Sequence, residues 1–310
     1  MIFFSTKFVF GYKNVCIQNT NQESFLTLEK NLYNKVSKTK DFFMFLCSKK
    51  YAYNLYGKNF FLSKDNMSEI QTTNPYEINS IVIEKNASLD DLHILLINKL
   101  TIQSVGLKDE CTLEWLSDLS NIIENTSISY VEFNYSVSLE KQLVIKGIFS
   151  NVYCQFNDSL SEKKLIFVIN ELFYIEAKHF NPYYNSKLLI KNNGGIYNSI
   201  LNGNRIKSKG GITPNENWFS TKEKTDVCMS CEYRFMCFDK KIPILRNAGR
   251  WYHNEECDYN PYIAKWKGDN GYQTLSECSI VSDENGFSID DEKVAKINKL
   301  LCDGEETKHA

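Results

Sequence analysis

The feature that most constrains this chain is a group of three cysteines within ten residues, CMSCEYRFMC at 228–237. The next cysteine is Cys257, so the full spacing is C-x2-C-x5-C-x19-C. Four thiolates can hold one tetrahedral zinc ion or one [4Fe–4S] cluster, in which each iron takes one cysteine sulfur. We therefore predict a metal centre in this part of the chain, formed by Cys228, Cys231, Cys237 and Cys257.

The spacing favours the cluster and leaves zinc open. Zinc patterns usually combine two short knuckles, either two C-x2-C pairs or one such pair with H-x3–5-H, and the second half of this pattern is neither. His253, four residues before Cys257, would serve as a zinc ligand in the alternative interpretation. The start of the chain, MIFFSTKFVFGY, lacks a cleavage site for secretion. We expect a cytoplasmic protein with reduced thiols rather than disulfides.

The overall composition excludes several classes of partner. The formal net charge is -2, and 43% of the residues are hydrophobic, as in ordinary globular proteins. No basic excess points to nucleic acid, and no apolar run approaches the length of a membrane-spanning helix. We therefore expect neither a nucleic acid nor a membrane as partner.

An alternation of predicted strands and helices occupies the middle of the chain. Strands are expected at 80–84, 102–107, 127–135, 151–156, 164–169 and 172–177, and helices begin at Ser88, Thr112 and about 138. This order predicts β-α units with a parallel sheet. About 100 residues are too few for a complete β/α barrel, which needs about 250.

We therefore predict an α/β fold in three parts. Residues 1–76 form a small N-terminal α+β unit that begins with a strand at 8–10. Residues 77–178 form a truncated, partly open, half-barrel-like β/α sheet. Residues 179–310 form a cysteine-rich domain that ends in a helix starting near Ser288.

Two segments carry a family resemblance: CMSCEYRFMCFDKKIPI and RWYHNEECDYNPYIAKWKGDNGY. They resemble the C-terminal SPASM domain of radical S-adenosylmethionine peptide maturases. More narrowly, they resemble the grasp-with-spasm type, which acts with an ATP-grasp ligase on ribosomally synthesised, post-translationally modified peptides. The resemblance covers about 215–302, with HFNPYYNSKLLI at 179–190 as its lead-in, and it is weak over 1–170.

The resemblance implies one auxiliary [4Fe–4S] cluster on the four cysteines already named. A second cluster is common in such domains, but its ligands would fall at Ser199 and Lys241 of this chain, so it is not expected. Cys278 lies outside the ligand set. It is interpreted as a small buried residue, or as a replacement for Cys257.

The radical-generating motif of that family, C-x3-C-x2-C, is missing. The earlier cysteines, Cys16, Cys47, Cys111 and Cys154, stand too far apart to form it. Binding of S-adenosylmethionine is not expected, and whether the protein is an enzyme is left open.

The predicted function is that of an accessory protein in peptide maturation, with a precursor peptide and an ATP-grasp ligase as partners. Residues 1–76 are a candidate leader-peptide recognition module, because such modules often capture a peptide by adding a strand to a sheet edge. The alternatives are an iron–sulfur oxidoreductase that modifies a peptide and a zinc-stabilised interaction protein.

Three arginines are further candidates near the cysteines. Arg234 is expected either to donate hydrogen bonds near the cluster or to form a surface ion pair with Glu232 or another nearby carboxylate. Arg246 and Arg250 are expected either to bind an acidic peptide segment or to be solvated loop charges.

Overall fold

The computed structural model describes residues 5–52, 78–85, 87–97, 102–124, 126–156, 166–201, 203–206, 212–247 and 249–306. Over these residues the fold is mixed α/β, with seven α-helices and a largest sheet of six strands. The chain divides into two compact units. Unit 1 comprises Met1–Ile70, Leu165–Tyr183 and Ser220–Ala310, and unit 2 comprises Gln71–Lys164 and Tyr184–Phe219.

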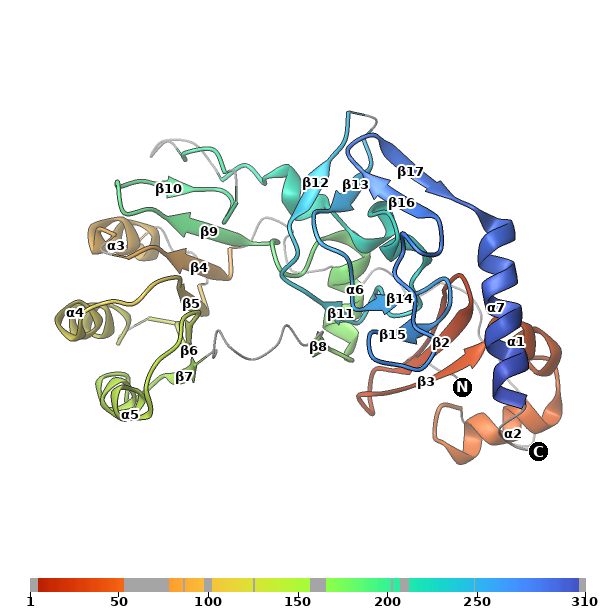
Figure 1. The fold of residues 1–310 in the computed structure, drawn as a ribbon. Helices are drawn as coiled ribbons and strands as arrows, with labels where there is room; N and C mark the ends of the chain where they lie inside the picture. Colours follow the sequence, from red (N-terminus) through yellow and green to blue (C-terminus); the bar gives the residue numbers. More distant parts are fainter. Residues whose placement is uncertain are drawn as a thin grey trace. The chain divides into compact units, whose positions relative to one another are not determined.

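Unit 2 is built on a six-stranded sheet in the order β10-β9-β4-β5-β6-β7 (Figure 1). The ladder from β9 to β7 is parallel, and β10 joins its edge in antiparallel pairing. Helices α3, α4 and α5 lie along one side of β4, β5 and β6 (Figure 1). The elements are β4 (Ser80–Ile83), α3 (Leu89–Ile97), β5 (Ser104–Leu107), α4 (Leu113–Ile123), β6 (Tyr130–Phe133), α5 (Leu139–Ile148), β7 (Tyr153–Phe156), β9 (Lys187–Ile190) and β10 (Ile196–Tyr197).

The helices of unit 2 begin where the sequence predicts. The Thr112 side chain accepts a hydrogen bond from the Trp115 N–H (3.3 Å) and so caps α4. The helix then buries an apolar face against the sheet, formed by Leu116, Leu119 and Ile123. The predicted β-α units with a parallel sheet are thus confirmed in this unit.

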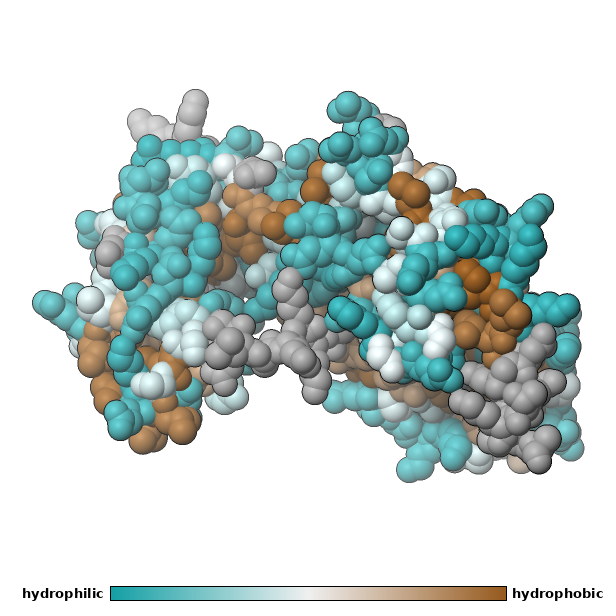
Figure 2. All heavy atoms as spheres, in the orientation of Figure 1, coloured by the Kyte–Doolittle hydropathy of each residue, from teal (hydrophilic) through white to brown (hydrophobic). Residues whose placement is uncertain are grey.

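Helix α5 leaves an apolar strip on the surface of unit 2. Leu139, Leu143 and Val144 are 78%, 72% and 49% exposed. Figure 2 shows hydrophobic surface in the region of this helix. The buried residue of the helix is Ile145. The helix therefore contacts the core with a narrow face.

Unit 1 begins with a three-stranded antiparallel sheet in the order β1-β2-β3, followed by two helices. Its elements are β1 (Thr6–Phe10), β2 (Asn14–Asn19), β3 (Ser24–Glu29), α1 (Lys30–Val36) and α2 (Lys40–Ser48). Val15 and Ile17 of β2 pack with Phe42, Phe43 and Leu46 of α2, because alternate side chains of a strand point to one face. The predicted strand at 8–10 is confirmed.

The remainder of unit 1 consists of short strands and turns around the cysteine motif, closed by a long helix. No helix among the described residues is long and apolar enough to cross a membrane. The helices and strands of this part are β8 (Ile166–Phe167), α6 (Glu171–His179), β11 (Cys237–Phe238), β12 (Pro243–Leu245), β13 (Trp251–His253), β14 (Tyr259–Asn260), β15 (Lys265–Trp266), β16 (Ile280–Asp283), β17 (Gly286–Ile289) and α7 (Asp291–Glu306). It also contains two short 3-10 turns, η2 (Lys222–Lys224) and η3 (Cys228–Ser230). A third 3-10 turn, η1 (Glu216–Phe219), belongs to unit 2.

Three sequence predictions need correction. Residues 172–177 are helical, within α6, because the Asn170 side chain caps the Phe173 N–H (2.8 Å) and the helix buries Phe173 and Ala177 one turn apart. Of the strand predicted at 164–169, Ile166 and Phe167 form β8, which pairs with β11 and not with the parallel sheet.

The third correction concerns the last helix. It begins at Asp291, because Ser288 belongs to strand β17. The predicted division at residues 76 and 178 stays a prediction, and its first boundary lies outside the described residues. In the structure, the strands of β1–β3 and the cysteine motif belong to the same unit.

Candidate metal centre

The first two cysteines of the motif lie on a tight turn. Val227, whose φ is +65°, leads the chain into η3, although this backbone region is unfavourable for a β-branched residue. The Cys231 N–H donates to the Cys228 carbonyl (2.9 Å) and closes the turn. The spacing of two residues thus becomes a compact loop that carries both thiols.

The other two cysteines come from separate elements of unit 1. Cys237 lies in β11, where pairing with Phe167 of β8 fixes its backbone. Cys257 lies between β13 and β14. All four predicted ligands, Cys228, Cys231, Cys237 and Cys257, line one cavity of about 30 Å³. The structure therefore brings together the residues that the sequence selected.

Backbone amides donate to two of the thiols. The Tyr233 N–H lies 3.4 Å from the Cys231 sulfur, and the Tyr259 N–H makes the corresponding bond to Cys257. In both cases the donor follows its cysteine by two residues. Such bonds stabilise the thiolate, the form that binds metals, and they tune the electronics of a bound centre.

A buried ion pair adds fixed charge to the cavity. Lys222 Nζ lies 2.5 Å from Asp239 Oδ2, and their side chains are 4% and 10% exposed. Burial raises the pKa of Asp239, but Lys222 outweighs this effect and holds the pKa at about 2. The Cys237 thiol also donates to Asp239 (3.5 Å). The lysine therefore keeps a carboxylate charged beside the thiols, and its own positive charge favours thiolates at Cys228 and Cys237.

His253 lies beside the first cysteine. Its Nδ1 is 3.8 Å from the Cys228 sulfur. Burial and the nearby Lys222 lower the pKa of His253 to about 3, so the imidazole is neutral, the form that binds metals. Its Nε2 is buried without a hydrogen-bond partner among the described residues. The histidine thus has the chemistry of a fifth candidate ligand.

The thiols resist ionisation when no cation compensates them. Burial raises the pKa of Cys228 to about 12, and burial also raises the pKa of Cys231, Cys237 and Cys257. A bound metal reverses this preference, because its own charge is the largest in such a site and deprotonates coordinating thiols. Four cysteine sulfurs around one cavity, with amide donors and a lysine, have the donor chemistry of an iron–sulfur cluster or a zinc site.

The N-terminal sheet packs directly behind the cysteine loop. Val9, Cys16 and Phe25 share an apolar core with Tyr233 and Tyr259, the two residues whose amides donate to the thiols. This contact uses the face of the sheet opposite to α2, since residues at alternate positions point to opposite faces.

A buried polar contact adds to this interface. The Tyr259 hydroxyl donates to Glu232 Oε1 (2.5 Å), and Glu232 is fully buried. Burial raises the pKa of Glu232. The backbone of Gly11, in the turn between β1 and β2, approaches this glutamate so closely that an added Cβ would lie 2.7 Å from its Oε2. The cysteine loop and the N-terminal sheet therefore share one tightly packed contact.

The arginines have structural partners. Arg234 Nη1 donates to the carbonyls of Phe10 and Cys231, both at 2.9 Å, so it joins β1 to the cysteine turn. Its carboxylate partner within 4 Å is Glu223, at 3.8 Å, whereas Glu232 bonds to Tyr259. The hydrogen bonds next to the cysteines are as predicted, and the ion pair is with a nearby carboxylate, Glu223, rather than with Glu232.

Arg246 is buried and Arg250 is half exposed. Arg246 pairs with the fully buried Asp226 and donates to the Gly286 carbonyl (3.0 Å), which fixes the β16–β17 hairpin. Arg250 lies 3.8 Å from the same aspartate. The interpretation of Arg246 as a free peptide-binding charge is therefore wrong.

The remaining predicted residues lie elsewhere. Cys278 is fully buried in an apolar core with Ile263 and Val294, apart from the cysteine cavity, as expected for a small core residue. Ser199 is buried in unit 2, and Lys241 lines the cysteine cavity in unit 1.

Sequence reasoning missed the pair of Lys222 and Asp239. The only local signal is that Asp239 follows Cys237 by two residues. Lys222 belongs to a run of ordinary polar residues, TKEKTD, and nothing in that run distinguishes a buried lysine from an exposed one.

Comparisons with known proteins add no family to this description. No family model, no curated protein and no solved structure matches the chain. Among the described residues, no three His, Cys, Asp or Glu side chains are grouped as the ligands of a single metal ion.

Proposed function

We propose that the four cysteines bind one [4Fe–4S] cluster in an accessory protein for maturation of a ribosomally made peptide. The observation that carries the proposal is that Cys228, Cys231, Cys237 and Cys257 line one cavity. The uneven spacing, three close cysteines and one remote, supports a cluster over zinc. The ten cysteines are all unpaired, which supports a reducing, cytoplasmic setting.

The chain's own residues prepare this site in three ways. Tyr233 and Tyr259 donate amide hydrogen bonds to sulfurs. Lys222 offsets part of the negative charge of the thiolates. The aromatic and apolar residues behind the loop exclude water. A bound cluster would supply one-electron redox chemistry or a structural cross-link.

The partner assignment rests on the resemblance to grasp-with-spasm proteins and on the N-terminal sheet. β1 and β3 are the edges of this sheet, and the Phe10 carbonyl of β1 already accepts from Arg234. We therefore assign the edge of β3 to the precursor peptide, which would add a strand there. The parallel sheet of unit 2 corresponds, in this proposal, to a truncated half-barrel without the radical-generating cysteines. An ATP-grasp ligase would form the peptide bond or ester, and this chain would present the substrate.

Metal analysis tests the cluster. The chain, purified without oxygen, is expected to be brown and to contain about four iron and four sulfide per chain. Cys231→Ala should lose this metal, whereas Cys111→Ala, in unit 2, should retain it. Colourless protein with one zinc would exclude the cluster.

Reconstitution tests the pathway. A candidate precursor peptide and a candidate ATP-grasp ligase, to be sought among the genes beside this one, are combined with and without the chain, and the peptide product is followed by mass spectrometry. Modification should require the chain and should fail with Cys231→Ala. Equal modification without the chain would contradict the accessory role.

A zinc-stabilised interaction protein is the second candidate, and His253 favours it. A neutral imidazole 3.8 Å from Cys228 is a plausible replacement for one thiolate in a Cys3His site. His253→Ala separates the two candidates. It should leave a cluster on four cysteines in place, but it should reduce zinc binding if histidine is a ligand.

A further inference from the structure

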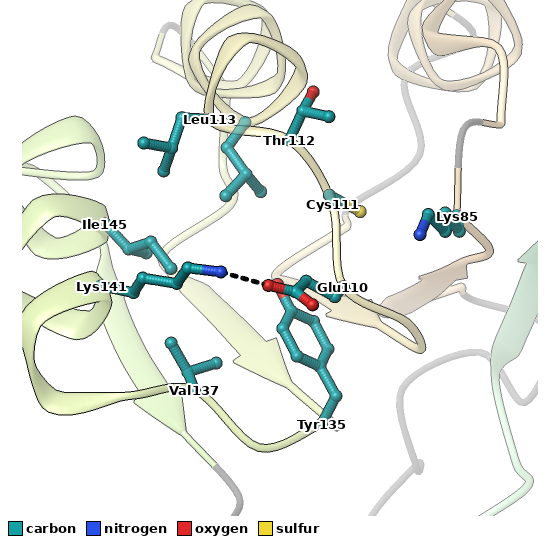
Figure 3. A pocket seen from close by; sticks show the side chains of 10 residues that line it. Lys85, Glu110, Cys111, Thr112, Leu113, Tyr135, Val137, Lys141 and Ile145 are labelled. Carbon is teal, nitrogen blue, oxygen red and sulfur yellow. Dashed lines mark hydrogen bonds and ion pairs between the residues drawn. The ribbon is translucent and has the colours of Figure 1, made fainter.

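Unit 2 contains a second cavity, of about 280 Å³, at the carboxyl ends of its central strands (Figure 3). Lys85 follows β4, Glu110 and Cys111 follow β5, and Tyr135 follows β6. In α/β sheets, ligands bind at this edge, because the loops there are free to carry polar side chains while the strands form the rigid base. The position of the cavity therefore makes it a candidate binding site independent of the cysteines.

The charges at the cavity are predominantly positive. Lys141 reaches in from α5 and pairs with Glu110 (2.5 Å), and both side chains are more than half exposed. Lys85 lies on the other side of Glu110 (Figure 3), and it also lowers the pKa of that carboxyl group. Among the described residues, Lys85 has no ion pair of its own. Two lysines thus face one glutamate, and one positive charge stays uncompensated.

Neutral donors add to this positive field. Thr112 and Leu113, at the start of α4, line the cavity, so the positive end of the helix dipole faces it. Burial and neighbouring charges raise the pKa of Tyr135 to about 12, so its hydroxyl stays protonated at neutral pH. Leu116, Val137 and Ile145 form an apolar wall. The cavity therefore combines cationic groups, hydrogen-bond donors and a nonpolar surface.

We propose that this cavity binds a small ligand that carries a phosphate or carboxylate group, held between Lys85 and Lys141. Lysine acts as a point charge toward either oxyanion, so the two lysines do not distinguish between them. The volume lies just below the usual range for small-molecule sites, which fits a small ligand of metabolite size. Glu110 forms an ion pair with Lys141 when the ligand is absent, and the ligand's anionic group displaces Glu110 when the ligand binds.

Cys111 provides a built-in reporter, because it lines the cavity and is partly exposed. The full-length protein is alkylated with iodoacetate, an anion, or iodoacetamide, its neutral analogue, and each cysteine is quantified by peptide mass spectrometry. The exposed Cys302 is the internal control. The ratio of the iodoacetate rate to the iodoacetamide rate should be about fivefold higher at Cys111 than at Cys302. Inorganic phosphate or malonate should protect Cys111 from both reagents and leave Cys302 unchanged.

Variants assign the effect to the two lysines. Lys85→Gln and Lys141→Gln should each remove most of the preference for iodoacetate and the protection by anions. Glu110→Gln should increase the preference for iodoacetate and the protection by anions, because it removes the carboxylate that competes for Lys141. The matched control is Lys146→Gln, on α5 outside the cavity lining, where the lysine stacks over Phe156; it should change neither.

The two protecting anions distinguish the ligand classes. Protection by phosphate alone assigns a phosphorylated ligand, and protection by malonate alone assigns a carboxylate. Absence of protection by both, or protection that survives in both lysine variants, overturns the proposal. None of these outcomes depends on the metal content of the protein.

Discussion

Lys222 brings a positive charge into the space between four cysteine thiols. Its ion pair with Asp239 is almost completely buried, so neither charge is solvated if the other is removed. The lysine also favours thiolates at Cys228 and Cys237. We therefore expect the lysine to contribute to stability and to the metal binding that we propose.

Replacing this lysine should be costly. Lys222→Met leaves Asp239 buried without its partner and should lower the free energy of unfolding by about 3 kcal/mol, measured by urea denaturation of the protein as purified. Lys224→Met, on the same turn but exposed, should change stability by less than about 0.5 kcal/mol. The double variant Lys222→Met/Asp239→Leu should recover part of the loss. A similar loss in the Lys224 variant would contradict the role of burial.

That four cysteines gather around one cavity was predictable from sequence, and the charges beside them were not. Three cysteines within ten residues form a local sequence pattern, and such a pattern can be recognised without knowing the fold. Lys222 and Asp239 come from η2 and from the segment after β11, and packing brings them together at the cavity. Their burial depends on that packing, which spacing alone does not encode.

At the scale of elements, the β1–β2 turn touches the cysteine loop through backbone atoms. Tyr12 N–H donates to the Ser230 carbonyl (2.7 Å), and an added Cβ at Gly11 would lie 2.8 Å from the Glu232 backbone nitrogen. A backbone neighbour cannot rotate away as a flexible side chain does. The two segments must therefore separate to accept any larger residue.

Gly11→Ala should destabilise unit 1 by on the order of 2 kcal/mol, because overpacking forces backbone shifts, and it should reduce the metal retained after purification. Gly147→Ala is the matched control. Its added Cβ would meet nothing within 4 Å, and alanine favours the α5 helix, so stability should rise by about 0.5–1 kcal/mol. Thermal unfolding measures both. An unchanged Gly11→Ala protein would show that the sheet and the loop are less closely packed than described.

Arg246 links the β16–β17 hairpin to the residues that precede Cys228, in addition to the apolar packing of Val227 with Ile280 and Phe287. Among the described residues, Arg246→Gln leaves the fully buried Asp226 with the more distant Arg250 as its cationic neighbour. The Asp226 carbonyl also accepts from the Cys228 N–H (2.7 Å), so a shift of this residue displaces the backbone of Cys228. We expect a loss of about 3 kcal/mol in urea denaturation. Arg250→Gln, about half exposed, should cost less than about 1 kcal/mol; equal losses would assign the anchoring to both arginines.

Element prediction succeeded where periodicity and capping agreed. The helix after Thr112 has both an N-cap and an apolar face, and it forms as expected. The segment LFYIEA is rich in residues that also favour strands, and its helical state is set by the Asn170 cap and by packing of Phe173 and Ala177. Local propensity was therefore insufficient in that segment, because tertiary contacts decided it.

At the scale of the whole molecule, unit 1 joins the two ends of the chain. The sequence suggested three consecutive parts, because composition and motifs change along the chain. The structure instead has β1–β3, α6 and the cysteine region in one unit, with a shared core. Segments that are distant in sequence pack together because their surfaces are complementary in shape. A single sequence does not reveal that complementarity. The parallel sheet of unit 2 has a separate core.

Loss of the metal should therefore loosen one unit and spare the other. The apolar core around Tyr233 and Tyr259 contains residues of unit 1 only, and the core of the six-stranded sheet contains residues of unit 2 only. In Cys231→Ala, amide exchange in β2, β11 and β14 should accelerate by about two orders of magnitude, because the thiols are no longer cross-linked. Exchange in β4, β5 and β6 should stay within about a factor of three of the unaltered protein.

Hydrogen exchange with peptide mass spectrometry measures both units in one sample, so unit 2 is an internal reference. Cys111→Ala is the matched control, since it removes a thiol from unit 2 that is no ligand of the proposed cluster. It should leave exchange in β11 and β14 unchanged. Acceleration of β4–β6 together with β14 in Cys231→Ala would mean that the two units unfold as one. Unchanged exchange in both units of Cys231→Ala would mean that the cysteine loop keeps its fold without a metal. The apolar contacts of Tyr233 and Tyr259 would then suffice to stabilise it.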